Sequence, residues 1–225
     1  FPAPKAGLNV LYVNSIVPYK QRKVKILNGS HTCLVPVSYL AGIDTVRETI
    51  EDPQLGKFVR EYIFDEVIPT IDIPHDQMVA YSNSVLERYG NPFVRHELMS
   101  IALNSVTKYK TRNLPVVLQS IEAGSFPKHA LFSLAALIAF YRGKRGNEDI
   151  ALKDDEWALD FFKKEWSNFD GSKEACRRIV TDFLGLEHHW ELNLNNLKGV
   201  TDFVTDCLYE IETKPMREAL AFIGC

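Results

Sequence analysis

Apolar residues recur at helical spacing along most of the 225-residue chain, and single glycines separate the helical stretches. One example is the run Leu55, Phe58 and Val59, whose spacing gives a helix one buried face. Only residues 8–13 favour a strand. No strand leads into a Gly-x-Gly-x-x-Gly turn, and strands do not alternate with helices. The pattern therefore predicts a mainly α, multi-helical domain over residues 18–225.

Prolines and glycines mark the expected boundaries of this domain and its helices. Prolines and a glycine precede the expected strand, so residues 1–17 are expected to form a linker and a short strand. Asp52 and Asn91 each stand before a proline, which combines an N-cap residue with the residue favoured at the first helical position. We therefore expect helices to begin at Pro53 and Pro92.

Composition and charge exclude several function classes. Hydrophobic residues make up 46% of the chain and the net charge is −3, so a basic face for nucleic acid or an anionic membrane is not expected. The longest apolar run, residues 130–141, is too short to span a bilayer and indicates a buried helix. The four cysteines show no C-x-x-C or zinc spacing, and no signal peptide opens the chain. Free thiols and a cytoplasmic location are expected.

One short segment, Lys23-Val-Lys-Ile-Leu-Asn28-Gly-Ser-His31, combines three side chains suited to ketone chemistry. A lysine can supply the proton that a ketone gains when hydride arrives, and an amide N–H₂ can hold the developing oxyanion. A histidine can fix a neighbouring hydroxyl. Alternatively, Lys23 is a solvated lysine, Asn28 ends a helix, and His31 is an ordinary histidine at a helix start.

The spacing of Lys23, Asn28 and His31 limits the helix geometry in which all three can face one substrate. At about 100° per residue on a regular helix, Lys23 and Asn28 lie about 140° apart, and Lys23 and His31 about 80°. The three side chains can face one substrate only if the helix is interrupted. Asn28-Gly29 is where we expect a helix stop or a π-bulge.

The residues around this segment resemble the C-terminal domain of the long-chain mannitol dehydrogenase family, and within it the branch of tagaturonate reductases (altronate oxidoreductases). The family pattern is a lysine, four residues, an asparagine, two residues and a histidine, followed by an apolar helix that ends in Leu-Ala-Gly. The chain keeps this pattern and continues through further motifs: Asp44-Thr-Val-Arg-Glu48, Asp52-Pro-Gln-Leu-Gly-Lys-Phe-Val59, Glu66-Val-Ile-Pro-Thr70 and the segment from Asn91 to Lys108. The resemblance covers the first half of the chain in detail and the remainder by helical character.

The resemblance implies a fold and an activity. The fold would be a helical dehydrogenase domain of the 6-phosphogluconate dehydrogenase C-terminal type. The activity would be NAD-dependent reduction of a keto-uronate, with the dinucleotide bound mainly by an N-terminal Rossmann domain that relatives carry before this segment. Fructuronate reductase and mannitol or mannitol-phosphate dehydrogenase are alternatives in the same class. By itself the chain is expected to be inactive or nearly so.

The resemblance also assigns residue roles. Lys23 would be the general acid and base, Asn28 the oxyanion donor and His31 the group that orients a substrate hydroxyl. Lys108 aligns with a family lysine that contacts substrate, whereas Ser100 stands where mannitol dehydrogenases carry an arginine. That departure argues against simple mannitol specificity.

Arg95 and His96 are further candidates for binding the carboxylate of a uronate, because a guanidinium matches carboxylate geometry. Glu97 beside them offers the alternative of a surface ion network.

Other groupings do not indicate a metal or nucleophile site, and no metal is expected. The adjacent histidines of Glu187-His188-His189 point to different sides of a helix or strand, and His129 is expected to be isolated. A function of another class stays open: the helical domain alone can serve as an interaction or oligomerisation module.

Overall fold

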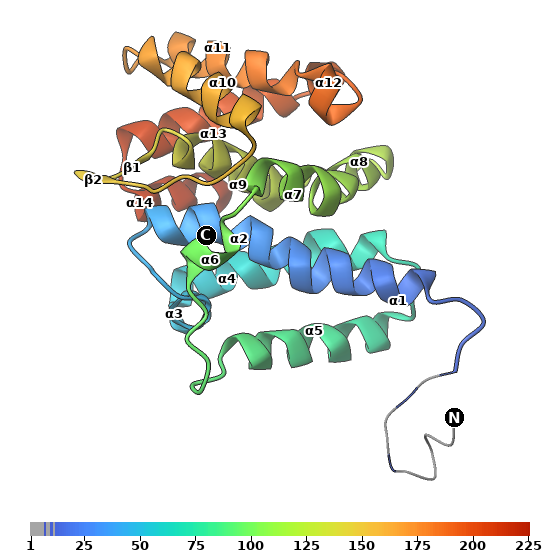
Figure 1. Cartoon of the computed structure of the whole chain (residues 1–225). Coiled ribbons are helices and arrows are strands. Elements are labelled where there is room, and N and C mark those ends of the chain that lie inside the picture. Colours follow the sequence, from blue (N-terminus) through green and yellow to red (C-terminus); the bar gives the residue numbers. More distant parts are fainter. Residues whose placement is uncertain (1–6, 8–9, 11) are drawn as a thin grey trace.

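The computed structural model describes residues 7, 10 and 12–225, and helices dominate this part of the chain (Figure 1), as the apolar spacing predicted. The α-helices are α1 Val17–Arg22, α2 Gly29–Leu40, α3 Val46–Glu51, α4 Pro53–Glu61, α5 His75–Tyr89, α6 Leu98–Ile101, α7 Ser105–Arg112, α8 Leu114–Glu122, α9 Lys128–Phe140, α10 Glu156–Ser167, α11 Lys173–Leu184, α12 Glu187–Trp190, α13 Val200–Thr213 and α14 Met216–Ala219. Two strands, β1 Lys144–Arg145 and β2 Glu148–Asp149, pair antiparallel.

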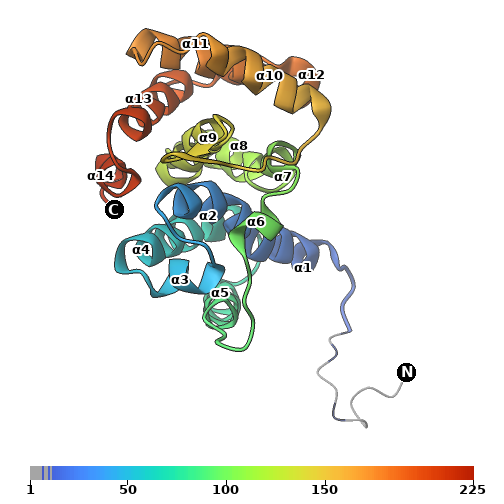
Figure 2. The ribbon, with the colours of Figure 1, turned by 60° about the vertical axis from the view of Figure 1, so that its left-hand side comes forward.

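The helices stack in layers (Figures 1 and 2). Helices α10, α11 and α12 form one end of the stack, and α7, α8 and α9 form the middle. Below them lie α1, α2 and α4, with α5 at the opposite end. The central helix is α9, which packs against α2 on one side and α13 on the other and is buried from His129 to Phe140. A helix that is apolar on every side is stable only in such a position.

Two long helices change their hydrogen-bonding pattern part-way. The first runs from Val17 to Leu40 as α1, the π-helix η2 (Lys23–Asn28) and α2 without a break. The second runs from Pro53 as α4, the π-helix η3 (Tyr62–Val67) and the 3₁₀ turn η4 (Ile68–Thr70). Within π-helices the bonds join residues five apart, and such segments are often found at functional sites.

The N-cap predicted at Asp52 is confirmed, and the one predicted at Asn91 is wrong. Oδ1 of Asp52 accepts hydrogen bonds from the amides of Gln54 and Leu55, both at 3.0 Å. In contrast, Oδ1 of Asn91 accepts from the Phe93 amide in a turn, and the next helix, α6, begins only at Leu98. Asn-Pro also favours turns, and here that tendency prevails.

The strand expected over residues 8–13 falls partly outside the described residues. Of its described residues, Val10, Tyr12 and Val13, none is in a strand. All four cysteines are free, as predicted from their spacing.

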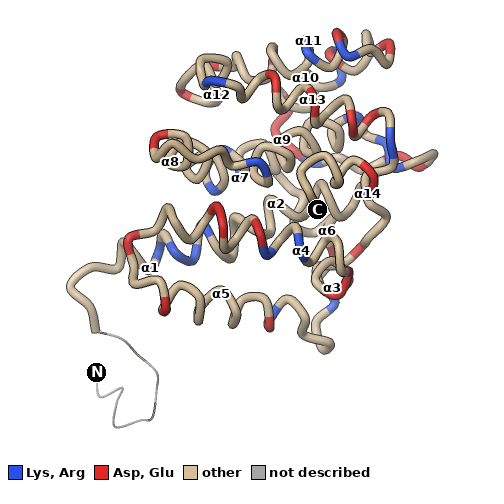
Figure 3. Tube along the Cα trace, turned by 180° about the vertical axis from the view of Figure 1, so that it is seen from behind, with Lys and Arg blue, Asp and Glu red and all other residues tan. Residues whose placement is uncertain are grey.

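Within the described residues, no helix is both long and apolar enough to cross a membrane. Basic and acidic residues are interspersed over the layers (Figure 3).

Gly56 allows α3 and α4 to approach closely. A Cβ at this position would lie 2.7 Å from the backbone oxygen of Ile50, so the two helices would have to separate. We expect Gly56→Ala to lower the free energy of unfolding by about 1–3 kcal/mol, the usual effect of overpacking. Urea denaturation measures this. Gly90→Ala is the control, because its Cβ would meet only atoms at 3.6 Å or beyond; equal stability losses in both variants would contradict the explanation.

Candidate functional site

The π-helix η2 contains two of the three ketone-chemistry residues, Lys23 and Asn28, and His31 follows in the first turn of α2, close enough for the charge of Lys23 to act on it. The Gly29 amide, which follows the segment, bonds to the Val24 carbonyl five residues earlier. This widened turn reduces the separation that a regular α-helix would impose between residues 23 and 28. The predicted interruption is therefore confirmed as a π segment that ends at Asn28, although the helix then continues as α2 and does not stop.

Lys25 shows how the segment is held. Its ammonium is buried and donates to the Thr70 carbonyl at 2.9 Å, to Thr70 Oγ1 at 3.1 Å and to Gln119 Oε1 at 2.5 Å. All three N–H donors are satisfied, and burial lowers the pKa of Lys25. Lys23, in contrast, is exposed. Lys25 thus anchors η2 to η4 and α8, whereas the side chain of Lys23 stays accessible to solvent.

His31 is held between two aromatic rings. Its imidazole stacks on Tyr89 with ring centroids 4.4 Å apart and meets the His96 ring edge-on at 5.0 Å. The Tyr89 hydroxyl is fixed in turn by the Leu27 carbonyl at 2.7 Å. Burial, reinforced by the charges of His96, Arg112 and Lys23, lowers the pKa of His31 to about 3. The imidazole is therefore neutral at physiological pH.

Two polar side chains at this site lack partners among the described residues. Nε2 of His31 is buried without a hydrogen bond. The half-buried amide of Asn28 has no side-chain hydrogen bond within the described part of the chain. Because buried polar groups are nearly always paired, His31 Nε2 is an atom that can accept or donate one further hydrogen bond.

Two cations from α7 complete the site. Nζ of Lys108 donates to the Ile101 carbonyl at 2.8 Å, and burial, with the charge of Arg112, lowers the pKa of Lys108. The guanidinium of Arg112 donates from one nitrogen to Thr32 Oγ1 at 3.1 Å and to the Asn28 carbonyl at 3.4 Å. Neither cation forms an ion pair with a carboxylate of the described residues. Asp154 partly offsets the charge of Lys108, whereas no carboxylate of the described residues pairs with Arg112.

Arg95 and Ser100 lie at the edge of this arrangement. Arg95 is exposed and pairs with Glu97, as the ion-network alternative expected. Ser100 is exposed and donates to the Glu97 carbonyl at 2.7 Å. Of the expected residues, His31 contacts His96 and lies near the charge of Lys23, and Arg112 connects the helix that carries Lys108 to Asn28. Arg95 is instead engaged with Glu97.

Sequence reasoning missed two neighbours of this group, Arg112 and Tyr89. Arg112 lies four residues after Lys108, and that spacing on a helix places both on one face. The four-residue spacing of Lys108 and Arg112 is visible in the sequence and could have indicated Arg112 as a further candidate. Tyr89 comes from α5, and nothing in the local sequence connects it to His31.

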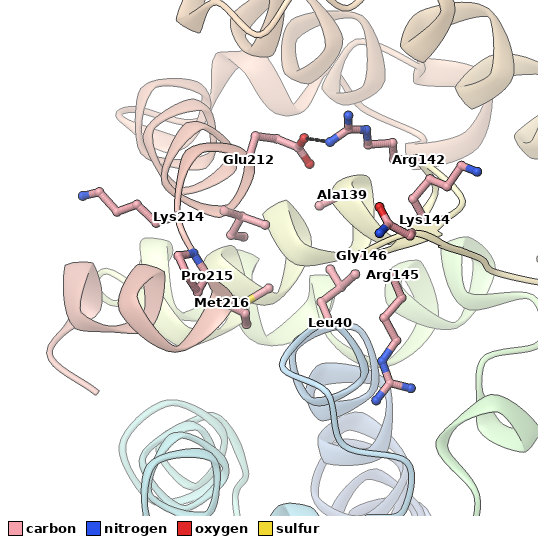
Figure 4. A pocket seen from close by; sticks show the side chains of 12 residues that line it. Leu40, Ala139, Arg142, Lys144, Arg145, Gly146, Glu212, Lys214, Pro215 and Met216 are labelled. Atoms are coloured by element: carbon pink, nitrogen blue, oxygen red, sulfur yellow. Dashed lines mark hydrogen bonds and ion pairs between the residues drawn. The ribbon is translucent and has the colours of Figure 1, made fainter.

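A hollow opens at the other end of α2, beside Leu40 and about 14 Å along the helix axis from His31 (Figure 4). Its volume is about 560 Å³. Its cations are each paired with a carboxylate: Arg142 with Glu212, Lys144 with Asp149, Arg145 with Asp44 and Lys214 with Glu210. This hollow therefore lacks the free positive charge of the site around His31.

The sequence profile of the mannitol dehydrogenase C-terminal domain matches residues 15–212. The chain belongs to this family. The match includes α1, η2 and α2, and therefore every residue of the Lys23–Asn28–His31 group. It confirms the family resemblance found in the sequence motifs.

Curated relatives of similar sequence are altronate oxidoreductases. The chain is 44% identical over 217 residues to the altronate oxidoreductase of Klebsiella pneumoniae (strain 342) and 43% identical to that of Escherichia coli O1:K1 / APEC. Each alignment covers 96% of this chain and 45% of the relative. The chain thus spans about half the length of the curated relatives that it matches.

Two solved structures share the fold. One is a Pseudomonas fluorescens mannitol 2-dehydrogenase in a ternary complex with NAD and D-mannitol, with a TM-score of 0.85 at 20% identity over 97% of this chain and 43% of that chain. The other is a D-sorbitol dehydrogenase in substrate-free form, with a TM-score of 0.76 at 22% identity and the same coverage. They agree with the predicted helical dehydrogenase domain.

The low pKa of His31 predicts a pH dependence of stability. In the unfolded chain His31 takes up a proton near pH 6.5, whereas in the folded protein it does so only near pH 3. Its contribution to stability is therefore complete above pH 6.5 and is lost progressively as the pH falls toward 3. Between pH 7 and pH 5.5 the loss is about 1 kcal/mol.

Urea unfolding at pH 7 and pH 5.5 measures this effect. His31→Gln should retain about 1 kcal/mol of the stability that the parent protein loses over this range. The control is His75→Gln, which removes an exposed imidazole from α5 and should behave as the parent does. Identical pH profiles for His31→Gln and the parent would contradict the prediction.

Proposed function

We propose that this chain is the C-terminal, substrate-binding half of an NAD-dependent uronate oxidoreductase that interconverts a keto-uronate and its hydroxy acid, as between tagaturonate and altronate. The observation that carries the proposal is the grouping of Lys23, Asn28 and His31 beside two cations that have no carboxylate partner among the described residues. The family membership and the altronate oxidoreductase relatives support it.

Each of the three residues has a chemical task in this proposal. Lys23 donates the proton to the oxygen of the ketone during reduction and removes it during oxidation. The Asn28 amide donates a hydrogen bond to the same oxygen as negative charge develops on it. Neutral His31 bonds to a neighbouring hydroxyl through Nε2, the atom left without a partner.

Lys108 and Arg112 would bind the carboxylate that distinguishes a uronate from a neutral ketose. One nitrogen of Arg112 is engaged with Thr32 and Asn28, and this bond sets the direction of its side chain. The planar guanidinium carries further N–H donors, which suit a carboxylate. A free carboxylate would neutralise charge that the site otherwise leaves uncompensated, whereas a neutral polyol would not.

The nicotinamide cofactor supplies the hydride, and we assign its binding mainly to another part of the full-length protein. The described residues contain no βαβ unit with a glycine-rich turn that could hold its phosphates. The four free thiols fit the reducing cytoplasm, where we place the enzyme.

Replacement of Lys23 tests the proton-transfer role. In the full-length protein, Lys23→Ala should lower kcat for keto-uronate reduction by about 10²- to 10⁴-fold. NADH binding, measured by fluorescence titration, should not change. Lys20→Ala, which removes an exposed lysine of α1, is the control and should keep parental activity. Parental turnover in Lys23→Ala would refute the assignment.

Replacement of Arg112 tests recognition of the carboxylate. Arg112→Gln should raise KM for the keto-uronate about 10- to 100-fold, since a hydrogen bond to a charged group contributes about 1.5–3 kcal/mol. Activity toward fructose, which lacks the carboxylate, should change little. Lys110→Gln is the control, because Lys110 lies on the same helix but pairs with Glu191. An equal loss with both substrates would show that Arg112 acts only through its bonds to Asn28 and Thr32.

The same cationic pair fits fructuronate as well as tagaturonate, because both carry a carboxylate. Fructuronate reduction is therefore the second candidate activity. A panel of keto-uronates assayed with the full-length protein and NADH separates the two.

A further inference from the structure

A second cluster of reactive side chains lies where α4, the start of α9 and the end of the described chain meet. His129, which the sequence analysis expected to be isolated, is buried there, and its Nε2 lies 2.9 Å from Glu61 Oε2. Sγ of Cys225 lies 3.2 Å from the same carboxylate oxygen and 3.6 Å from His129 Nε2. One carboxylate oxygen, one imidazole nitrogen and one sulfur therefore converge on a single point.

The imidazole is oriented for this role by a fourth residue. Nδ1 of His129 lies 2.7 Å from Oε1 of the buried Glu66. Glu66 also accepts from the backbone amides of His129 at 2.7 Å and Ala130 at 2.9 Å. Its position is thus fixed by three hydrogen bonds. A histidine that ligates a metal commonly has such a carboxylate on its other nitrogen.

The three distances are close to those of a tetrahedral zinc site. With ordinary Zn–N, Zn–O and Zn–S bond lengths, ligand atoms stand about 3.4 Å (N to O), 3.6 Å (S to N) and 3.6 Å (S to O) apart. The observed separations are 2.9, 3.6 and 3.2 Å. The ligands would need to spread by about half an ångström at most, which the partly exposed side chains of Glu61 and Cys225 permit.

We propose that Glu61, His129 and Cys225 bind a zinc ion, with Glu66 holding the histidine. Three protein ligands leave the fourth tetrahedral position for water, and the exposed side of Glu61 and Cys225 provides the path of entry. Thiolate and imidazole donors select zinc over magnesium or calcium, which prefer oxygen ligands.

Two nearby lysines bear on the affinity of this site. Nζ of Lys57 lies 3.6 Å from Glu61 Oε1 and donates to the Gly224 carbonyl at 2.6 Å. Nζ of Lys128 donates to the Ile223 carbonyl at 2.5 Å. Their charges oppose a cation, whereas Glu61, Glu66 and a Cys225 thiolate attract it. The lysines also fasten the same segment that brings Cys225 to the cluster.

Besides its open coordination position, the zinc ion would link separate parts of the chain. The ligands come from α4, α9 and the segment after η6 (Leu220–Ile223), so the metal would join three parts of the chain. The candidate site around His31 shares none of these ligands. The proposal therefore stands independently of the proposed enzymatic activity.

Metal binding to the full-length protein tests the proposal. The protein is stripped with a chelator, and zinc is titrated in competition with a chromophoric chelator. We expect a site that is lost in Cys225→Ser and Glu61→Gln and weakened about 10- to 100-fold in Glu66→Gln, which loses only the partner of the histidine. Cys176→Ala removes a thiol of α11 outside the cluster and should bind zinc as the parent does.

Two further measurements keep the outcome clear if a variant folds poorly. Cobalt added to the parent protein should give the near-ultraviolet absorption of a thiolate-to-cobalt bond, and Cys225→Ser should abolish it. Zinc should also raise the thermal midpoint of the parent but not that of Cys225→Ser. Absence of the cobalt–thiolate band from the parent, or unchanged zinc binding in Cys225→Ser, would overturn the proposal and leave a hydrogen-bonded cluster without metal.

Discussion

The hydrogen bond from the Gly29 amide to the Val24 carbonyl is the interaction on which the candidate site depends. It closes a turn five residues long inside a helix that otherwise follows the α pattern. Several contacts hold this widened turn in place. Asn113 donates to the Gly29 carbonyl at 3.1 Å and to the Tyr62 hydroxyl at 2.9 Å. A side chain at Gly29 would meet that hydroxyl at 3.3 Å, so the glycine allows the close approach.

The second π segment, η3, has a parallel arrangement. Glu61 precedes it and Glu66 lies within it, five residues later, and both carboxylates reach His129. In the second long helix the wider turn thus brings two carboxylates five positions apart toward one imidazole. The first residue of η3, Tyr62, is connected through Asn113 to the carbonyl of Gly29, which directly follows η2, and η2 also packs against η3. The two irregular turns therefore pack against each other and do not occur as separate defects.

The sequence predicts local features of this fold better than it predicts contacts between distant segments. Helical spacing and glycine punctuation predict the mainly α fold, and the mismatch between residues 23, 28 and 31 predicts an interruption in the helix. The extent of the π segment was not predictable, because it depends on Lys25 reaching Thr70 and Gln119. Likewise, the neighbours of His129 come from residues more than 60 positions away.

The error at Asn91 has a related cause. Asn-Pro is compatible with both an N-cap and a turn, and the choice depends on what the following backbone can bond to. Here the His96 carbonyl accepts from the Val46 amide at 3.0 Å, and the Leu98 amide donates to the Asp44 carbonyl at 2.8 Å. These bonds to a distant loop hold residues 96–98 in an extended path. They also place the His96 ring against His31, which a helix beginning at Pro92 would not have done.

Lys108 and Arg112 form no ion pair within the described residues, and this has a consequence for the electric field around the candidate site. Cations that form no ion pair among the described residues project an attractive field into solvent, which would draw an anion in before any contact forms; the charge of Asp154 weakens this field at Lys108. At physiological ionic strength this field extends about 8 Å, and added salt shortens it. In the hollow beside Leu40, by contrast, each cation forms an ion pair with a carboxylate, so the field that this region projects into solvent is weak. The two ends of α2 therefore differ in their electric field, and an anion would approach the end near His31 more readily than the end near Leu40.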